Sequence, residues 1–314
     1  MPSPASVVVI IGTGGTIAGT AARPQDHTSY TAGALSADAL IAAVPALAGQ
    51  ELESESLAQI DSCDMDHATW VRLARCVQKH LARVDVAGVV ITHGTDTLEE
   101  TALFLHLTVH ADKPVVLTAA MRPATAPSPD GPQNLVDAIV FARQAGACGV
   151  LALIGGVVHA ATEVRKLHGY RVDAFSSGDA GPLALLQDGH IRQLRPWPAA
   201  APRHAAALDV DSSAWPVVDI VTSHAGARAA TVDALVAAGA RGLVFAGSGN
   251  GSVHAALLAA ARQAVQRGVR VVRASRCITG GVVGMPDRAL PSGGQLTPAQ
   301  ARVQLMLELL SAAK

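Results

Sequence analysis

The sequence predicts an α/β protein with a larger N-terminal domain on a doubly wound parallel sheet and a smaller C-terminal α/β domain. Three observations predict this fold class. The chain has 314 residues, about twice the usual length of one domain. Short β-branched runs that are apolar on both faces alternate with amphipathic helical stretches, as in parallel sheets with right-handed helical crossovers. A proline-rich stretch without hydrophobic periodicity separates the two parts.

The N-terminal domain is expected to contain four buried parallel strands joined by three helices. The predicted strands are Val7–Ile11, Gly88–Thr92, Pro114–Thr118 and Gly149–Ile154, and the predicted helices are Asp66–Val84, Leu98–Val109 and Gly131–Ala145. Asp66 precedes the periodic apolar residues of the first helix and is its expected N-cap. After Gly155 the pattern changes to short strand-like pieces, including Leu183–Gln187 and His190–Leu194 around the turn Asp188-Gly189.

Four prolines within residues 196–216 indicate a linker between the domains. The predicted boundaries are therefore 1–195 for the N-terminal domain, 196–216 for the linker and 217–314 for the C-terminal domain. In the C-terminal domain we expect strands at Val217–Thr222, Gly242–Ala246 and Val269–Ala274, and helices at Thr231–Ala238, Val253–Arg267 and Pro298–Ala312. Thr297 is the expected cap of the last helix.

The composition excludes several classes of protein. Apolar residues make up 50% and charged residues 16% of the chain, which excludes an intrinsically disordered protein. The aromatic share of 3% gives no stacking platform for single-stranded nucleic acid, and a net charge of −1 without a basic cluster gives no site for a phosphate backbone. We therefore expect no nucleic-acid partner. The four lysines are Lys79, Lys113, Lys166 and Lys314.

The N-terminus and the cysteines indicate a reduced, cytoplasmic protein. The first six residues lack the basic region of a signal peptide, and the apolar run Val7–Ile11 is too short for a leader or a membrane span. We therefore expect no membrane association. Cys63, Cys76, Cys148 and Cys277 form no CxxC pair, and we expect no histidine at metal-ligand spacing from them. We expect neither a metal nor a cofactor.

Three of the predicted parallel strands end in polar turns. These turns are Gly12–Thr16, Thr92–Thr97 and Ala119–Pro123. Loops at the carboxyl ends of parallel strands line the crevice in which such sheets bind ligands. The first two turns are rich in threonine and glycine, which favours a hydroxyl nucleophile with backbone N–H donors close by.

A threonine nucleophile needs a base or a nearby cation, and the sequence offers two candidates. Asp96 directly follows Thr95, and Lys166 ends an apolar stretch shortly after the fourth predicted strand. An ordinary solvated lysine is the alternative interpretation of Lys166. Other sites fit less well: a phosphate-binding loop needs a lysine that is missing here, and a dinucleotide loop needs glycine where Ile17 stands. No G-x-S-x-G motif occurs, which excludes an α/β-hydrolase serine.

Two segments, Gly14–Gly19 and Thr92–Thr101, resemble the paired threonine signatures of bacterial L-asparaginases. Met121–Pro123, Asp130–Pro132, Gly249–Gly251 and Ala301–Val303 continue the match, so the resemblance covers nearly the whole chain. It implies an L-asparagine amidohydrolase that releases ammonia and L-aspartate through a threonine β-aspartyl ester. It also implies a homotetramer built from intimate dimers.

The resemblance implies roles for individual residues. Thr16 matches the nucleophile, and Tyr30 matches the tyrosine of a lid that closes on the site. Thr95 and Lys166 match the second threonine and its lysine partner, while Asp96 matches the carboxylate that holds the substrate's α-ammonium group. The further substrate-binding residues that it implies are Gly15, Ser62, Cys63 and Ala120 and, from a neighbouring subunit, Ser252 or alternatively Asn250.

Departures from the family pattern leave alternatives open. Cys63 stands where secreted members often carry glutamine, and Asp287 is the candidate for an acidic residue from the partner subunit. A glutaminase–asparaginase of broader specificity is one alternative, because one methylene is discriminated by only about 1–3 kcal/mol. A non-catalytic amino-acid-binding relative is the other. If Lys166 is buried beside Asp96, its replacement by methionine should cost about 3–5 kcal/mol of stability.

Overall fold

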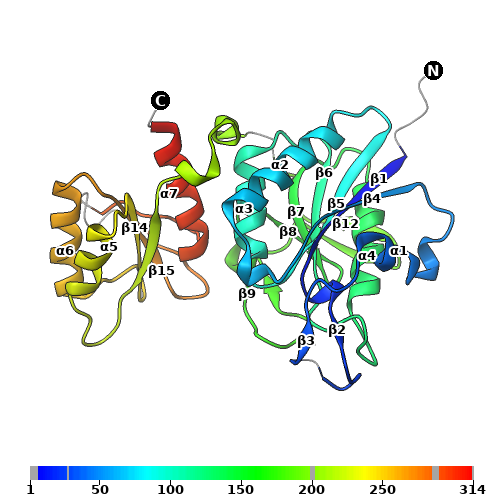
Figure 1. Ribbon diagram of the computed structural model, residues 1–314, viewed down its shortest axis with the longest axis horizontal. Helices are drawn as coiled ribbons and strands as arrows, with labels where there is room; N and C mark the ends of the chain where they lie inside the picture. Colours follow the sequence, from blue (N-terminus) through cyan, green and yellow to red (C-terminus); the bar gives the residue numbers. More distant parts are fainter. Residues whose placement is uncertain (1–5, 27, 199–201, 285–289, 313–314) are drawn as a thin grey trace. The chain divides into compact units, whose positions relative to one another are not determined.

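The computed structural model describes residues 6–26, 28–198, 202–284 and 290–312. Contacts divide the chain into two compact units, Met1–Leu208 and Asp209–Lys314, each with its own sheet (Figure 1). The linker over residues 196–216 stays a prediction, and the chain there forms two short 3-10 turns, Ala205–Asp209 and Ser212–Ala214. In the part of the chain that the structure describes, no helix combines the length and the apolar character needed to cross a bilayer.

The N-terminal unit is built on an eight-stranded sheet. Its strands are β1 (Val7–Gly14), β4 (Leu52–Ile60), β5 (Val86–Thr92), β6 (Pro114–Thr118), β7 (Gly149–Ile154), β8 (Val157–Ala160), β11 (Ala184–Gln187) and β12 (His190–Gln193). They lie in the order β12-β11-β8-β7-β6-β5-β1-β4. The strands from β7 to β4 run parallel, whereas β8, β11 and β12 join by antiparallel pairing, so the sheet is mixed.

The strand order reverses between β1 and β5. The chain passes from β1 to β4 on one side and then returns to β5 on the other side of β1. At such a switch point the loops that follow the two neighbouring strands diverge, and a crevice opens at the carboxyl ends. The turns that follow β1 and β5 are the two threonine-rich turns, so the topology places both at the switch point.

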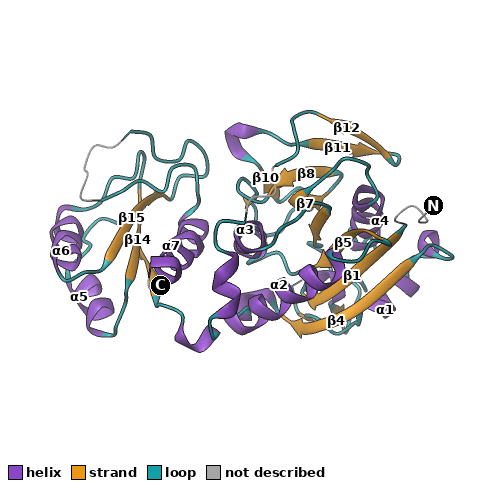
Figure 2. Cartoon of the chain, turned by 90° about the horizontal axis from the view of Figure 1, so that it is seen from above, coloured by secondary structure: helices purple, strands orange, loops and turns teal. Residues whose placement is uncertain are grey.

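Helices cover both faces of this sheet (Figure 2). Helices α1 (Ala37–Ala42) and α4 (Gly131–Ala142) pack on one face, and α2 (His67–Leu81) and α3 (Leu98–Thr108) on the other. Because both faces are covered, β5, β6 and β7 are buried almost throughout and read as continuous apolar runs. The predicted doubly wound α/β class is confirmed, and Asp66 caps α2 as expected by accepting a hydrogen bond from Thr69 N at 2.7 Å.

Strand β4 is absent from the predicted elements, and the sheet has five parallel strands instead of four. Its sequence, LESESLAQI, contains no apolar run because β4 is the edge strand and most of its residues are only half-buried or exposed. Charged side chains are typical of such edges, since they oppose pairing with another chain. The apolar periodicity that identifies central strands is therefore missing here.

The C-terminal unit is a smaller three-layer α/β structure. Its strands β13 (Val218–Thr222), β14 (Gly242–Gly247) and β15 (Arg270–Ser275) run parallel, and its helices are α5 (Ala230–Ala237), α6 (Ala255–Gln266) and α7 (Pro298–Ala312). Figure 2 shows α5 and α6 on one face of the sheet and α7 on the other. Thr297 begins α7 with a capping box: its Oγ1 accepts from Gln300 N, and Gln300 Oε1 accepts from Thr297 N, both at 3.1 Å.

Candidate active site

The turns that follow β1, β4 and β5 pack directly against one another. Gly15 has a φ of +78°, and a Cβ there would lie 2.2 Å from Gly94 Cα. A Cβ on Gly94 would meet Ser62 Oγ. Glycine is therefore required at both positions, because any side chain would separate the three turns. The close packing brings Thr16, Ser62 and Thr95 to one end of the sheet.

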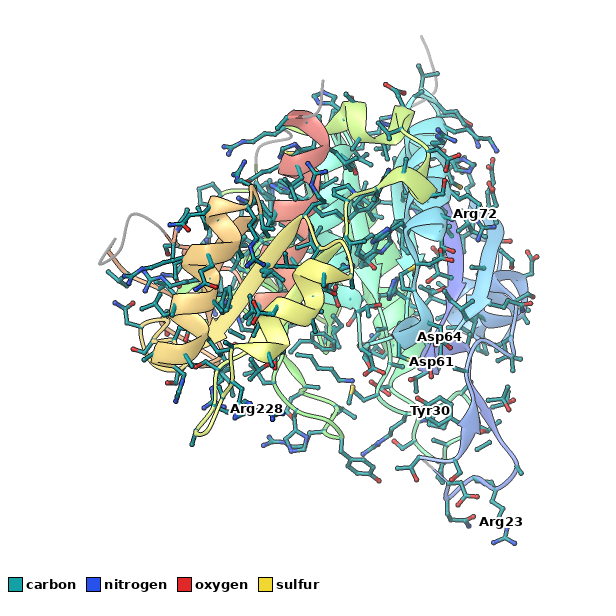
Figure 3. All side chains as sticks on the ribbon, turned by 60° about the vertical axis from the view of Figure 1, so that its left-hand side comes forward. Arg23, Tyr30, Asp61, Asp64, Arg72 and Arg228 are labelled. Atoms are coloured by element: carbon teal, nitrogen blue, oxygen red, sulfur yellow. The ribbon has the colours of Figure 1, made fainter. Side chains whose placement is uncertain are left out.

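Thr16 lies in the 3-10 turn Thr16–Ala18 and is almost completely buried. Its Oγ1 lies 2.6 Å from the hydroxyl oxygen of Tyr30. Tyr30 begins β3 (Tyr30–Thr31), which pairs with β2 (Thr20–Ala21) in a hairpin. Figure 3 shows Tyr30 near Asp61, with Arg23 pointing away at the far end of the same hairpin. The structure thus places the expected lid tyrosine on the expected nucleophile.

The hairpin is held over the site by contacts with the turn that follows β6. Gly19 O accepts from Ala124 N, and Ala21 N donates to Thr125 Oγ1, both at 2.9 Å. A Cβ on Gly19 would lie 2.8 Å from the Tyr30 ring, so the ring packs against bare backbone there. These contacts describe a closed arrangement, in which Tyr30 shields Thr16 from water.

The pKa of Tyr30 is raised above its ordinary value. Burial of the phenol is the main cause, and the negative charges of Asp61 and Asp96 act in the same direction, while the hydrogen bond with Thr16 opposes them. The phenol is therefore protonated at neutral pH, and it is a hydrogen-bonding partner of Thr16 and not a standing anionic base.

The turn that follows β5 pairs a hydroxyl group with a lysine. Lys166 Nζ donates to Thr95 Oγ1 at 2.8 Å and to Asp96 Oδ1 at 2.5 Å. Lys166 belongs to β9 (Arg165–Lys166), which pairs with β10 (Phe175–Ser176), and its backbone N–H donates to Glu99 Oε2 at 3.1 Å. The alternative of an ordinary solvated lysine is wrong. The sequence alone does not indicate that Glu99 holds the Lys166 backbone.

The expected stability loss for Lys166→Met assumed a buried ion pair, but the pair of Lys166 and Asp96 is only partly buried. The Lys166 side chain is 20% exposed, but that of Asp96 is 53% exposed. Water can therefore solvate the Asp96 carboxylate when its partner is removed. A loss of 3–5 kcal/mol applies to fully buried pairs, whereas a pair of this exposure contributes about 1 kcal/mol or less.

Ser62 and Cys63 follow β4 in the 3-10 turn Ser62–Asp64. Ser62 is buried, and its Oγ accepts from Asp96 N at 3.1 Å while its carbonyl accepts from Thr97 Oγ1 at 2.7 Å. Cys63 is exposed, and the pKa of its thiol is raised mainly by desolvation and also by Asp61. On balance this environment disfavours the thiolate, which argues against Cys63 as a nucleophile.

The turn that follows β6 carries Ala120 and is fixed by Asp130. The two carboxylate oxygens accept from Met121 N and Arg122 N, each at 2.9 Å. A Cβ on Gly131 would lie 2.9 Å from Ile17 Cγ1 and 3.4 Å from Ala120 Cβ, which places Ala120 beside the residue that follows Thr16. Asp130 lies in a segment that the resemblance includes, but its role in holding the turn depends on a contact that sequence reasoning missed.

The structure distinguishes the backbone donors of the threonine-rich turns and shows the contacts of Asn250. The Gly15 N–H donates to Ile60 O at 2.9 Å, so it is not free to bind an oxyanion. Within the described residues the Thr95 N–H has no acceptor, and it is the better candidate. Asn250 lies in the C-terminal unit and pairs through its amide with the backbone of Val283.

Ser252 also lies in the C-terminal unit, where its backbone pairs with Ser248 in an isolated bridge. The expectation that Ser252, or alternatively Asn250, reaches the site of a neighbouring subunit stays a prediction. Asp287 lies outside the described residues.

The expectation that no histidine stands at metal-ligand spacing from a cysteine is wrong. Cys76 and His80 stand four residues apart on α2, and together with Glu55 of β4 they form a group whose ligand atoms lie within 4.8 Å of one another. Residues four apart face the same side of a helix, which is a suitable spacing for two metal ligands. All four cysteines are free.

Two buried histidines make stability depend on pH. Burial lowers the pKa of His93 and of His159 to about 4, below the value of roughly 6.5 in an unfolded chain. Between these values the unfolded state binds more protons, so stability falls as pH decreases. We expect the free energy of unfolding to fall by about 2–4 kcal/mol from pH 7 to pH 5, measured by urea titration.

His159→Gln should remove about half of this decrease, because one of the two titrating groups is lost. His190→Gln is the matched control, since His190 lies exposed on β12. A free energy of unfolding that stays constant between pH 7 and pH 5 would contradict this prediction.

Comparison with known proteins follows the same division of the chain. The family described as "Asparaginase, N-terminal" matches residues 7–198, and "Glutaminase/Asparaginase C-terminal domain" matches residues 217–313. The L-asparaginase 2 of Bacillus subtilis is 38% identical over 96% of this chain and 81% of its own. The glutaminase-asparaginase of Pseudomonas fluorescens is 35% identical over 96% of this chain and 86% of its own.

A solved structure is also similar. It is described as "Probable Cytoplasmic L-asparaginase from Campylobacter jejuni", and it superposes with a TM-score of 0.92 at 40% identity, covering 98% of this chain and 96% of its own. The similarity thus extends over both units of the chain.

Proposed function

Because this chain belongs to the asparaginase family, we propose that it hydrolyses the side-chain amide of L-asparagine to L-aspartate and ammonia, with Thr16 as the nucleophile. The protein is an asparaginase. One observation carries the assignment of Thr16: its buried hydroxyl lies at the switch point of the sheet, 2.6 Å from the Tyr30 hydroxyl.

The proposed reaction proceeds through an ester. Thr16 Oγ1 attacks the amide carbon, the C–N bond breaks, and the nitrogen leaves as ammonia after it takes up a proton. Water then hydrolyses the β-aspartyl ester, releases aspartate and restores the Thr16 hydroxyl. Because Tyr30 is protonated at neutral pH, it takes the Thr16 proton only as it passes its own proton on.

Thr95 and Lys166 supply the second part of the machinery. The Thr95 oxygen accepts from Lys166 Nζ, so its own hydrogen is directed elsewhere, toward the reacting groups. We assign this pair the proton transfers to the leaving nitrogen and from the attacking water. The Thr95 N–H stabilises the oxyanion, and the loss of one such donor typically lowers the rate by about 10²–10³.

Asp96 and Ser62 hold the charged ends of the substrate. Half of the Asp96 side chain is exposed, which leaves carboxylate surface for an α-ammonium group. Ser62 Oγ accepts from Asp96 N, so its O–H remains able to donate to an α-carboxylate. Ala120 and Cys63 complete the lining, from the turns that follow β6 and β4.

Replacement of Gly94 tests the binding role of Ser62. In Gly94→Ala the new Cβ overlaps Ser62 and separates the turns, so we expect the KM for L-asparagine to rise about 10-fold or more and kcat to fall as well. The overlap should also lower the free energy of unfolding by about 1–3 kcal/mol. Steady-state kinetics and urea unfolding measure both effects.

The matched control is Gly169→Ala. A Cβ at Gly169 would meet nothing within 4 Å, and its φ is not positive. Gly169→Ala should leave KM and stability unchanged. If Gly94→Ala binds asparagine as tightly as the unmodified protein, Ser62 is not the carboxylate ligand.

A coupled ammonia assay with L-asparagine, L-glutamine and D-asparagine tests the substrate. We expect kcat/KM for L-asparagine to exceed that for L-glutamine by about 10- to 200-fold, the range that one methylene allows. Equal kcat/KM values for the two amino acids would support a glutaminase–asparaginase of broader specificity, like the 35% identical Pseudomonas fluorescens enzyme. Asparagine binding without ammonia release would instead support a non-catalytic relative.

We also propose a homotetramer of intimate dimers in the cytoplasm. In this arrangement Ser252, or alternatively Asn250, reaches the site of a neighbouring subunit. The four free cysteines support a reducing compartment. Light scattering of the purified protein should give four times the mass of the chain, and cell fractionation tests the compartment.

A further inference from the structure

Glu55, Cys76 and His80 form a cluster of three different metal-ligating side chains away from the active site. Glu55 projects from the edge strand β4, and Cys76 and His80 project from one face of α2. Among the described residues this is the one group of three or more such side chains whose ligand atoms lie within 4.8 Å of one another. The proposed hydrolysis uses none of them.

The atoms are already close to the positions that a tetrahedral ion needs. His80 Nε2 lies 2.9 Å from Glu55 Oε2. Ligand atoms around tetrahedral zinc lie about 3.3–3.5 Å apart, given its bond lengths of about 2.0 Å to nitrogen or oxygen and 2.3 Å to sulfur. A change of about 1 Å, within reach of the Glu55 side chain, therefore converts the cluster into a coordination site.

Two side chains of the cluster are buried, and the third is partly exposed to solvent. Cys76 and His80 are buried, so their positions are set by packing within α2 and the sheet. The Glu55 side chain is 40% exposed and gives an ion a path from solvent.

The charges favour a divalent cation with an affinity for sulfur. Burial and the Glu55 carboxylate raise the pKa of the Cys76 thiol to about 12, so the thiol ionises only as the metal binds. The resulting thiolate and the Glu55 carboxylate then neutralise one doubly charged ion, and the His80 imidazole adds a nitrogen ligand. Thiolate and imidazole ligands select zinc over magnesium or calcium, which prefer oxygen. Lys79 Nζ lies 3.5 Å from Glu55 Oε2 but its side chain is 69% exposed, so it can swing away.

We propose that Glu55, Cys76 and His80 bind one zinc ion, with a water molecule as the fourth ligand. The Cys76 thiol gives its proton to solvent as the zinc–sulfur bond forms. Glu55 lies five residues before the end of β4 at Ile60, or about 17 Å along the strand at 3.3 Å per residue. The ion therefore joins β4 to α2 at a distance from the reacting atoms, and it stabilises the fold without entering the hydrolysis.

Titration of the metal-free 314-residue chain with Co²⁺ and then Zn²⁺ tests the site. We expect one equivalent of Co²⁺ to produce thiolate-to-cobalt charge-transfer absorption in the near ultraviolet, and Zn²⁺ to displace it. The melting temperature should rise with the Zn²⁺ concentration. Absence of the absorption, or no change of melting temperature with Zn²⁺, would overturn the proposal.

Variants identify the ligands. Cys76→Ser and His80→Gln should each lower the Zn²⁺ affinity by more than about 100-fold, since even outer partners of a ligand contribute 10- to 100-fold. Cys277→Ser is the matched control, because Cys277 is an exposed cysteine outside the cluster. Unchanged ammonia release and circular dichroism show that each variant is folded. A Cys76→Ser protein that keeps the cobalt absorption would assign the metal to other residues.

Lys79→Met provides a variant with the opposite expected effect. It removes the cation beside Glu55 and should tighten Zn²⁺ binding by about two- to fivefold. Weaker binding would contradict the location of the ion beside Glu55.

Discussion

Thr16→Ala is expected to lower kcat for L-asparagine by a factor on the order of 10⁴ or more, because the atom that forms the ester is removed. The melting temperature should change little. Tyr30 is only half-buried, so solvent can satisfy its hydroxyl once the Thr16 hydroxyl is removed. Ammonia release under saturating asparagine and thermal unfolding measure the two effects.

Two controls separate loss of the nucleophile from a general disturbance. Thr16→Ser keeps a hydroxyl at the same position and should retain measurable turnover. Thr31→Ala removes an exposed threonine from the same hairpin and should leave kcat unchanged. Near-normal turnover by Thr16→Ala would remove Thr16 from the mechanism, although the protein would remain an asparaginase with another nucleophile.

Lys166→Met is expected to lower kcat by about 10²–10⁴, the usual contribution of a positioned proton-transfer group. The substitution leaves Thr95 Oγ1 without its donor at 2.8 Å and Asp96 without its cation. Because half of the Asp96 side chain is exposed, the free energy of unfolding should fall by only about 1 kcal/mol or less. Kinetics and urea unfolding of the same preparation test both statements.

Lys79→Met is the matched control for Lys166→Met. Lys79 also pairs with a carboxylate, but on the exposed side of α2, and its loss should leave kcat unchanged. If Lys166→Met keeps normal turnover, the contact with Thr95 has no catalytic role. A loss of 3–5 kcal/mol in stability would show that the pair is shielded from water in solution.

Much of the fold could be predicted because the central strands are covered on both faces. Burial on both faces requires continuous apolar residues, and β6 and β7 begin and end at the predicted residues. Strand β4 could not be found in this way, since an edge strand needs only its backbone pairing with β1 and tolerates charges. The missing strand also concealed the switch point, which β4 creates by lying beyond β1.

The candidate site, too, could be predicted from the sequence only in part. Thr16, Thr95 and Asp96 could be located because they stand in turns at the ends of parallel strands, which are local features of the sequence. The hydrogen bond between Thr16 and Tyr30 and the contact of Lys166 with Thr95 depend on where loops return in space. The first contact joins residues that are 14 positions apart in the chain, and the second joins residues that are 71 positions apart. Hydrophobic periodicity does not predict which distant residues come into contact.

The sequence by itself determined the class of the fold, the turns that carry the hydroxyl groups and the family, because these depend on local apolar patterns and short motifs. Only the tertiary structure decided that Gly15 N–H is engaged by Ile60 and that Glu99 holds the Lys166 backbone. It alone joined Glu55 to Cys76 and His80. The physical reason is that hydrogen-bond partners and degrees of burial are set by close packing between segments distant in the chain.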